Sequence, residues 1–361
     1  MGTRILQLDK HNEIIRIAQF ADLHFGEDLK KDRLTLQLMR SVVKKESPDF
    51  AVFTGDQVAG YNAFSSQEKL LLWERALSVM AEFHIPFATI FGNHDDQSYK
   101  LDLLLCNTWA YYVLYTELVV CILLCVFMQR KGRRNIPTEG CVLFFMIIIS
   151  MGCIYASMPS HDVRRSLVTH EHQVYPTLSY TDIGPEDVNG VSNYRVIIKL
   201  KATGQSLPLF FMDSGGGMTE IAIHSNQLQW LSTFEQNTEQ ATTALAFIHV
   251  APVQYHSMFF NHKCQGSIPK ESVNTCPGSE RLLNTLYTRG VRALFVGHDH
   301  GNEWCCSKDN MLLCYGKHSG FGGYDFNETV RGVRIIDVNA SSGAISTYIS
   351  FWDSTNRGQW D

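Results

Sequence analysis

The stretch Ile90-Phe91-Gly92-Asn93-His94-Asp95-Asp96 decides the fold and the chemistry that we expect of this chain. An apolar run, residues 86–90, leads into a glycine, and the next positions carry an amide, an imidazole and two carboxylates. A turn needs only small or turn-forming residues, so it does not require this density of ligand side chains. The stretch therefore predicts a strand that ends in a metal-binding or proton-transferring site.

Four further apolar runs end in the same kinds of side chain. They are residues 14–20 before Asp22 and His24, residues 50–53 before Asp56, residues 244–248 before His249, and residues 291–296 before His298, Asp299 and His300. Loops that leave the carboxyl ends of strands gather at one edge of an α/β sheet, so these side chains are expected to meet.

Apolar runs of strand length alternate with segments of helical period between Arg16 and Ile90. This alternation predicts a mostly parallel sheet. The expected elements are strands at 14–20, 50–53 and 86–90 and helices at 29–45 and 70–83. Further along they are a hairpin of 193–201 and 207–213, helices at 227–234 and 280–288, and strands at 244–248, 291–296, 311–315, 333–338 and 345–351.

The composition describes a chain that can bury a large core. It has 361 residues, of which 45% are hydrophobic and 19% charged. The formal net charge is -5 and the pI is about 6.3, which gives no basic footprint for nucleic acid or for an anionic membrane. We therefore expect no nucleic-acid partner.

The N-terminus and the positions of the cysteines indicate whether disulfides are expected. Residues 1–17 lack the apolar core of a signal peptide, so no secretory signal is expected. All ten cysteines follow position 105, and five of them lie within residues 100–155. The odd remainder, without a signal peptide, favours free thiols over a disulfide framework.

Residues 100–155 break the alternating pattern. Two apolar stretches, residues 101–128 and 141–158, flank the basic run Gln129-Arg130-Lys131-Gly132-Arg133-Arg134. Their lengths suit transmembrane helices, the second only marginally. However, a cytoplasmic basic run would force about a hundred N-terminal residues across the membrane without a signal.

Residues 100–155 have three interpretations. Joining residue 99 to residue 156 gives an ordinary polar loop and a chain of 361 - 56 = 305 residues, so the segment is interpreted as a retained intron or a gene-model insertion. A genuine membrane hairpin and a buried pair of helices are the alternatives. The protein is expected to be cytoplasmic under the first interpretation and to contact a membrane only under the second.

The motifs together, in their order along the chain, resemble those of the calcineurin-like metallophosphoesterases. The matching motifs are Asp22-x-His24, Gly55-Asp56, Gly92-Asn93-His94-Asp95, a lone His249 after a strand, and Gly297-His298-x-His300. Residues 187–194, 210–214, 297–302 and 314–316 resemble the branch of plant and fungal purple acid phosphatase-like proteins. The resemblance covers nearly the whole chain except residues 100–155.

The resemblance implies the architecture of the whole chain. Residues 1–361 would form one domain, interrupted by residues 100–155. Its fold class would be α/β, an α+β sandwich in four αββα layers, with two mixed β-sheets packed face to face and flanked by helices. The site would lie at the carboxyl ends of the central strands.

The resemblance also implies a dinuclear metal centre. One metal ion would be held by Asp22, His24, Asp56 and His300, and the second by Asp56, Asn93, His249 and His298. His94 would lie at the phosphate, with Asp95 as its orienting partner. This mixture of carboxylate, imidazole and amide ligands suits Mn, Fe, Zn or Mg.

Two departures from the purple acid phosphatase pattern concern the chromophore. Ala59 occupies the position where those enzymes have a tyrosine, and Tyr61 comes two residues later. His24 replaces a glycine of that pattern. Both differences favour a colourless two-metal site.

The expected function is hydrolysis of a phosphoric ester by a metal-bound hydroxide, which makes the chain a phosphatase. A phosphodiesterase of the same fold is the first alternative. An inactive membrane-inserted or misspliced binding protein is the second. Residues 316–324, which are rich in glycine, are expected to form a substrate loop.

Overall fold

The computed structural model of the chain describes residues 3–63, 65–97, 160–235, 241–261, 264–267, 269–326 and 330–352. The predicted insertion at 100–155 lies outside the described residues. Within the described parts, no helix combines the length and the apolar character that a membrane span requires.

A five-stranded mixed sheet contains the first three predicted strands. Its order is β15-β14-β2-β3-β4. The bounds are β2 Ile14–Phe20, β3 Phe50–Thr54, β4 Phe87–Ile90, β14 Gly332–Asn339 and β15 Ile345–Phe351. Strands β2, β3 and β4 are parallel, whereas β14 runs antiparallel to β2 and β15.

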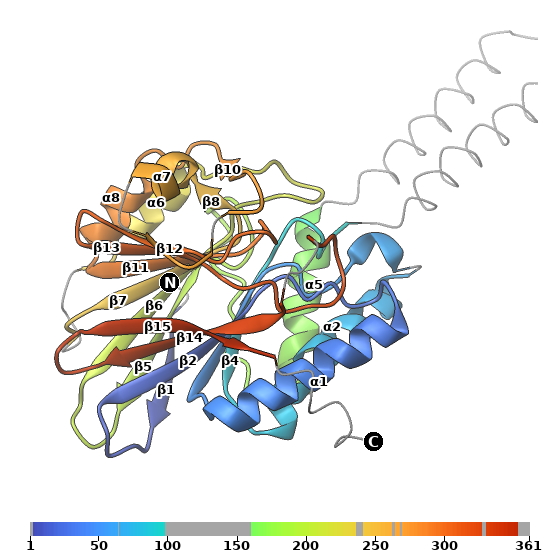
Figure 1. Cartoon of the computed structure of the whole chain (residues 1–361), viewed down its shortest axis with the longest axis horizontal. Coiled ribbons are helices and arrows are strands. Elements are labelled where there is room, and N and C mark those ends of the chain that lie inside the picture. Colours follow the sequence, from blue (N-terminus) through green and yellow to red (C-terminus); the bar gives the residue numbers. More distant parts are fainter. Residues whose placement is uncertain are drawn as a thin grey trace, which may run out of the picture.

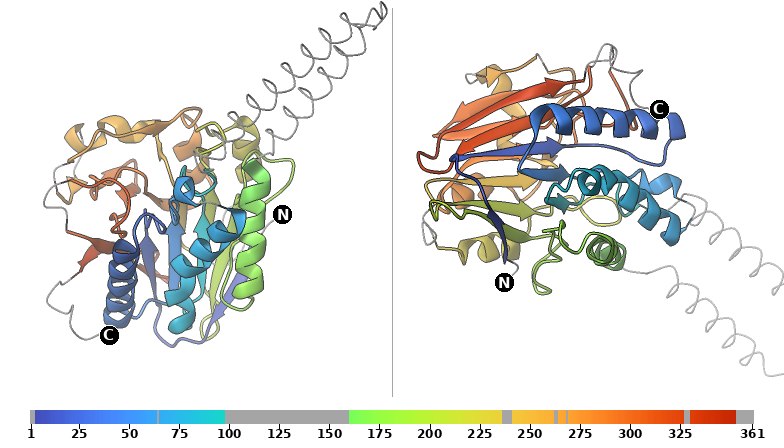
Figure 2. Two further views of the ribbon diagram at one scale, coloured as in Figure 1. Left: turned by 90° about the vertical axis from the view of Figure 1, so that its right-hand side faces the viewer. Right: turned by 90° about the horizontal axis from the view of Figure 1, so that it is seen from below.

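Three helices cover the outer face of this sheet (Figures 1 and 2). They are α1 Leu29–Glu46, α2 Ser66–Glu82 and α5 Ser160–Val174. Asp28 caps α1 by accepting from the amides of Lys30 and Lys31, and Ser65 caps α2 in the same way at Glu68. The buried faces of these helices form one apolar cluster with the outer face of β2 and β3.

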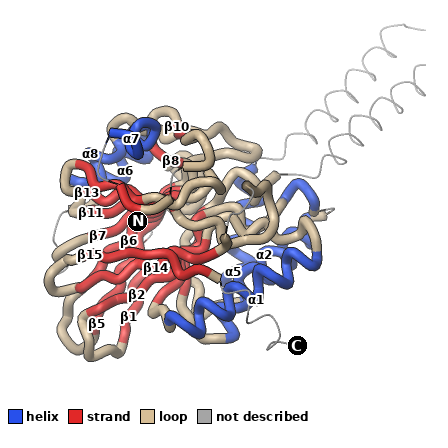
Figure 3. The backbone as a smooth tube through the Cα atoms, viewed as in Figure 1, coloured by secondary structure: helices blue, strands red, loops and turns tan. Residues whose placement is uncertain are grey.

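The second sheet has eight strands in the order β1-β5-β6-β7-β11-β13-β12-β9. Its strands are β1 Thr3–Leu8, β5 Tyr194–Leu200, β6 Ser206–Met212, β7 Ala244–Ile248, β9 Cys264–Gln265, β11 Val291–Val296, β12 Cys305–Lys308 and β13 Met311–Tyr315. The helices α6 Ser225–Ser232, α7 Met258–Asn261 and α8 Leu282–Tyr287 lie over its outer face (Figure 3). Two short strands, β8 Ala251–Pro252 and β10 Thr275–Cys276, pair beside them.

The two sheets pack against each other through a fully buried cluster that takes side chains from both. Neighbouring strands of the larger sheet contribute stacked rings at its centre, Tyr194 on Phe211 at 4.6 Å, Phe211 on Phe247 at 5.4 Å and Phe247 on Phe295 at 5.5 Å. Helix, sheet, sheet and helix therefore follow one another as four layers. The predicted fold class is confirmed.

The sequence pattern did not predict the strand β1 or the short strands β9 and β12. Strand β1 pairs in parallel with β5, about 190 positions away in sequence, and its side chains Arg4, Ile5 and Gln7 are exposed. An edge strand with this many exposed positions has no clear apolar alternation. Its place depends on a partner that the local sequence does not reveal.

The prediction that the cysteines remain free thiols is wrong for four of them. Cys264 is bonded to Cys306 and Cys305 to Cys314, and Cys276 is a buried free thiol among the described residues. Both bonds join residues directly opposite each other on antiparallel strands, β9 with β12 and β12 with β13. Strand pairing, rather than cysteine spacing, thus brings the thiols together.

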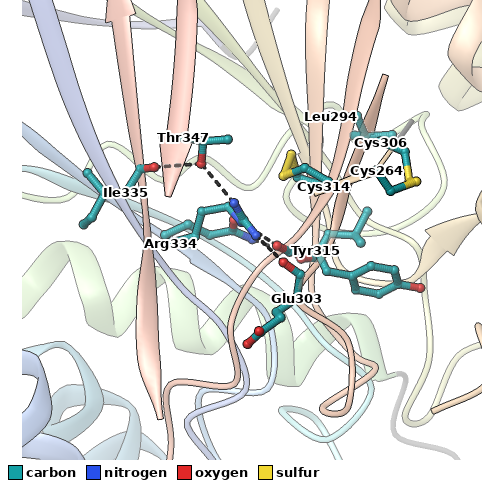
Figure 4. The surroundings of a disulfide bond; sticks show 12 residues. Cys264, Leu294, Glu303, Cys306, Cys314, Tyr315, Arg334, Ile335 and Thr347 are labelled. Carbon is teal, nitrogen blue, oxygen red and sulfur yellow. Dashed lines mark hydrogen bonds between the residues drawn. A yellow bond between two sulfur atoms is a disulfide. The ribbon is translucent and has the colours of Figure 1, made fainter. Parts of the chain in front are cut away.

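A buried arginine crosses from the smaller sheet to this disulfide-bonded strand pair (Figure 4). Arg334 of β14 donates to the carbonyl oxygens of Tyr315 at 2.5 Å and Glu303 at 2.6 Å, and to Oγ1 of Thr347 at 3.1 Å. Glu303 lies just before β12, and Tyr315 is the last residue of β13. The two sheets are therefore linked at the end of the molecule from which the loop of residues 297–302 departs.

Candidate metal centre

The predicted ligands lie on the loops that leave β2, β3, β4, β7 and β11. Four of them have left-handed backbone conformations, with φ of 58° at Asp22, 50° at His24, 55° at Asp56 and 73° at His298. Residues other than glycine rarely adopt this region, and such residues concentrate at functional sites. The chain thus turns sharply at the very residues that carry the ligand atoms.

The first group of candidate ligands consists of Asp22, His24 and His300. The Nε2 atoms of His24 and His300 are 3.2 Å apart, and Nε2 of His300 is 3.8 Å from Oδ1 of Asp22. All three side chains are buried. A buried carboxylate facing two imidazole nitrogens matches the ligands of a divalent transition-metal ion.

The second group consists of Asp56, His249 and His298. Nε2 of His249 lies 3.4 Å from Oδ2 of Asp56 and 3.1 Å from Oδ1 of Asn93. The predicted amide ligand Asn93 is therefore at the edge of this group. Rings of His249 and His298 meet edge to face at 5.1 Å.

Asp56 connects the two groups. Its Oδ2 atom is 3.4 Å from His249 of the second group and 3.8 Å from Nε2 of His24 of the first. The same oxygen is 4.0 Å from Nε2 of His94. One carboxylate thus faces imidazoles from three different loops, as a bridging ligand must.

Two of the histidines are oriented through their other ring nitrogen. His249 donates from Nδ1 to the carbonyl oxygen of Thr54 at 2.8 Å, and His300 donates from Nδ1 to the carbonyl oxygen of Tyr324 at 2.7 Å. This directs Nε2 of both rings at the carboxylates, where each nitrogen can ligate a metal ion once it carries no hydrogen. Metal-ligating histidines are held by second hydrogen bonds of this kind, so the residues fit a metal centre.

The electrostatics of the site also suit ligands. Burial lowers the pKa of His24 to about 4 and the pKa of His298 to about 3, so both imidazoles are neutral at physiological pH. Burial raises the pKa of Asp56, but His249 and the other facing imidazoles outweigh it and hold that pKa well below its usual range. Burial raises the pKa of Asp22, and a bound cation would oppose that effect.

His249 has the opposite shift. Burial by itself lowers its pKa, but the Asp56 carboxylate raises it to about 9. Without a bound cation, the His249 imidazolium is the positive charge that Asp56 faces. A metal ion would replace this proton.

A glycine permits the close approach of two ligand loops. A Cβ atom on Gly92 would lie 2.1 Å from Oδ1 of Asp56. Any other residue at this position would displace the bridging carboxylate. The glycine of the Gly-Asn-His-Asp stretch therefore has a steric reason to precede Asn93.

His94 lies at the open side of the centre, with 27% of its side chain exposed. Its Nδ1 is 2.9 Å from Oε1 of Gln97. The ring of Tyr61 meets it edge to face at 5.2 Å. The imidazole is thus held by a side chain three residues later and by an aromatic ring from the loop after β3.

Asp95 does not face the His94 side chain, which corrects the expected role of Asp95 as the orienting partner. Its carboxylate accepts from the backbone amides of Asp56 at 3.0 Å, Val58 at 3.0 Å and Gly92 at 2.7 Å. The residue therefore ties the loop after β3 to the loop after β4. Burial and the nearby Asp56 raise the pKa of Asp95 to about 7.

A buried ion cluster behind Asn93 was not predicted from the sequence. Arg164 of α5 donates to Asp96 at 2.9 Å and to both carboxylate oxygens of Asp213 at 2.8 and 2.7 Å. It also donates to the carbonyl oxygen of Gly216 at 2.9 Å. The cluster fixes the end of the Asn93 loop against β6, although its members are far apart in sequence.

The predicted substrate loop, residues 316–324, lies beside the first group of ligands. Tyr324 stacks on the His300 ring at 3.9 Å, and the buried ring of His318 is 3.8 Å from it on another side. A Cβ atom on Gly323 would be 2.6 Å from the His300 ring. The loop thus encloses His300, while contact with a substrate stays a prediction.

Comparison with known proteins finds a family model that matches part of this chain and relatives that match most of it. The model of the calcineurin-like phosphoesterases matches residues 15–140. The chain is 24% identical to "Probable inactive purple acid phosphatase 28" of Arabidopsis thaliana, over 91% of this chain and 76% of that protein. It is 23% identical to "Phosphatase DCR2" of Saccharomyces cerevisiae, over 92% of this chain and 53% of that protein.

Solved structures with similar folds include GAP50, described as the anchor in the inner membrane complex of Plasmodium. It has a TM-score of 0.42 and 13% identity, covering 94% of this chain and 90% of that one. A phosphatase from Mycoplasma pneumoniae has a TM-score of 0.41 and 7% identity, covering 94% and 93%. These values describe a distant likeness of fold.

Proposed function

We propose, from the calcineurin-like phosphoesterase domain that this chain carries, that the protein is a phosphatase that hydrolyses phosphoric monoesters with two metal ions. The observation that carries the proposal is the position of Asp56. One of its oxygens lies within 4.0 Å of imidazole nitrogens of His24, His94 and His249. A carboxylate between two sets of histidines is the arrangement that a two-metal site for phosphoryl transfer needs.

Each metal ion would have its own ligand set. Asp22, His24 and His300 would hold the first, Asn93, His249 and His298 the second, and Asp56 both. Bound there, two ions of Mn, Fe, Zn or Mg would supply Lewis-acid stabilisation of the phosphoryl oxygens and a nucleophile at neutral pH.

The exposure of the ligands indicates where the ester would bind. Asn93, His94 and His298 are half-buried, whereas Asp22, His24, Asp56, His249 and His300 are buried. The phosphate group would therefore approach from the side of the first three residues. In that position the imidazolium form of His94, with hydrogen on both ring nitrogens, would donate from Nε2 to the leaving oxygen or to the transition state.

The names of the two relatives differ: the Arabidopsis protein is called a probable inactive phosphatase, and the yeast protein is called a phosphatase. The completeness of the ligand set in this chain supports an active enzyme. The Tyr61 hydroxyl donates to the carboxylate of Glu27, and Ala59 stands where a purple acid phosphatase has its tyrosine. We therefore propose a colourless centre without a metal-bound tyrosinate.

The test compares 4-nitrophenyl phosphate with bis(4-nitrophenyl) phosphate as substrates of the Mn²⁺-loaded protein. Faster turnover of the monoester is expected, and Asn93→Ala should abolish it. Asn284→Ala, on the exposed face of α8, is the matched control and should retain activity. Preference for the diester would favour the phosphodiesterase alternative, and no turnover of either ester by folded, metal-loaded protein would refute the proposal.

A further inference from the structure

We propose that Gln97 is a positioning residue that fixes the orientation of His94 and presents Nε2 of this imidazole to the substrate side of the metal centre. The proposal rests on the function proposed above for its catalytic consequence. The orientation itself rests on contacts between described residues. These contacts are a hydrogen bond from one ring nitrogen of His94 to the Gln97 side chain, and a hydrogen bond that anchors the Gln97 backbone. The remaining contacts of His94 do not distinguish the two orientations of its ring.

The hydrogen bond determines which nitrogen of His94 carries the proton that faces away from the site. Oε1 of Gln97 lies 2.9 Å from Nδ1 of His94. An amide oxygen can only accept, so Nδ1 is the donor. Nε2, which is 4.0 Å from Oδ2 of Asp56, is then the nitrogen directed at the metal centre.

The other contacts of His94 hold the residue but do not select this orientation. Its backbone amide donates to Oδ1 of Asp56 at 2.7 Å, and its carbonyl oxygen accepts from Gly60 at 3.1 Å. The Tyr61 ring packs against the imidazole at an interplanar angle of 71°. An imidazole turned by 180° about its last torsion has almost the same shape, so packing accepts both orientations. Gln97 favours only one.

The backbone of Gln97 is anchored from a helix. The carbonyl oxygen of Gln97 accepts from Nζ of Lys69 at 2.6 Å. Lys69 belongs to α2 and is 7% exposed. The backbone that carries the positioning side chain is therefore tied to a rigid element, as precise placement of a functional group requires.

An amide suits this position better than a carboxylate. The site already contains the carboxylates of Asp22, Asp56 and Asp95, all buried. A neutral acceptor orients the imidazole without adding a further negative charge near the phosphate group of the proposed substrate. This gives a physical reason for Gln97, rather than Asp95, to accept from His94.

The kinetic test uses Gln97→Leu, Gln97→Glu and the exposed Gln173→Leu as the matched control. With Mn²⁺-loaded protein and 4-nitrophenyl phosphate, Gln97→Leu should lower kcat about tenfold and leave KM within about twofold, because a misdirected acid-base group loses part of its usual 10²–10⁴-fold contribution. Gln97→Glu retains an acceptor for Nδ1 and adds one negative charge, so its kcat should fall less than that of Gln97→Leu and stay within about threefold of the wild type. An unchanged kcat in Gln97→Leu, or equal losses in Gln97→Leu and Gln97→Glu, would overturn the proposal.

A second readout does not depend on activity. Long-range ¹H–¹⁵N correlation of histidine-labelled, metal-free protein reports which ring nitrogen carries hydrogen, and His94→Asn identifies the signals of His94. We expect hydrogen on Nδ1 in the wild type and loss of this preference in Gln97→Leu. Hydrogen on Nε2 alone in the wild type would refute the assigned role of Gln97. A wild type with the expected tautomer but no hydrolysis of any ester would refute the proposed function alone.

Discussion

The candidate metal ligands Asp22, His24, Asp56 and His298 all have a backbone of positive φ. Each such conformation costs on the order of 1–3 kcal/mol and persists only where its surroundings impose it. The surroundings here are hydrogen bonds between the ligand loops, such as the donation from the amide of His24 to the carbonyl oxygen of Asp56 at 2.9 Å. The geometry of the centre is thus built into the backbone as well as the side chains.

Metal binding should release a proton from His249. Its pKa of about 9 means that the imidazole is protonated at pH 7.5, and a metal ion binds only the neutral form. Because the folded pKa is above that of free histidine, this proton stabilises the metal-free protein at neutral pH, and its contribution is lost as the pH rises through about 9.

Calorimetry in buffers of different ionisation enthalpy measures how many protons are released when the metal binds. Titration with Zn²⁺ at pH 7.5 should release about one proton from the second ligand group, and none from it at pH 10. His249→Gln should remove that release. A heat of binding that is independent of the buffer would contradict the assignment.

Asp22→Asn should stabilise the metal-free protein and weaken metal binding. Burial raises the pKa of Asp22, so ionisation of its carboxyl lowers the free energy of unfolding at neutral pH. Asparagine removes this charge while it keeps an acceptor for the amide of His298. The expected gain is about 0.5–2 kcal/mol, as for other substitutions that relieve a functional site.

Thermal unfolding with and without Mn²⁺ checks this result. The wild type should gain more in Tm from the metal than Asp22→Asn does. The exposed Asp9→Asn is the control and should behave as the wild type does. A lower Tm of metal-free Asp22→Asn would show that the ionised carboxyl does not destabilise the fold.

At the level of elements, β12 is held on both sides by disulfides, Cys305–Cys314 toward β13 and Cys264–Cys306 toward β9. This edge of the sheet supports the loop that carries His298 and His300, the last two candidate histidine ligands. Tyr315, which follows Cys314, donates to Oδ2 of Asp299 at 2.6 Å. The disulfide-bonded strands therefore reach the residue between His298 and His300.

Replacing Cys305 and Cys314 together by serine should lower the free energy of unfolding by about 2–3 kcal/mol, because the bond closes a short loop of the unfolded chain. Urea unfolding of oxidised protein measures the difference. In excess reductant, the variant and the wild type should unfold at similar urea concentrations. Equal stabilities under oxidising conditions would mean that this bond does not form.

The strands at the centre of both sheets could be predicted because their signals are local. Residues 14–20, 244–248 and 291–296 appear as strands with the predicted bounds. The partners of Arg164 could not be predicted, because Asp213 contacts Arg164 only after α5 and β6 pack together. Gln97 lies three residues after His94, and this short spacing was a local signal for their contact. The partner expected for His94 was instead the carboxylate of Asp95.

On the scale of the whole molecule, an ion pair between Asp96 and Arg164 joins the parts of the chain that precede and follow residues 100–155. Their ion pair, at 2.9 Å, is buried. We propose that residues 3–97 and 160–352 belong to one domain, because the two regions share this pair and both sheets combine strands from them. Residues 100–155 would then be dispensable for folding.

Deletion of residues 100–155 tests this proposal. Residues 98, 99 and 156–159 would remain between Gln97 and Ser160, and six residues can span about 20 Å. The shortened chain should fold and retain its affinity for Mn²⁺, measured by equilibrium dialysis. Failure to fold, or a need for detergent, would instead support a genuine membrane hairpin, and sequencing of the transcript across the segment gives an independent check.

The most direct test of the proposed two-metal phosphatase activity is a titration of the metal-free protein with Mn²⁺ during hydrolysis of 4-nitrophenyl phosphate. Activity should rise until two equivalents are bound. Asp56→Ala should show no such rise, because the bridging carboxylate serves both ions. Saturation at one equivalent, or two bound ions without any hydrolysis, would contradict the account.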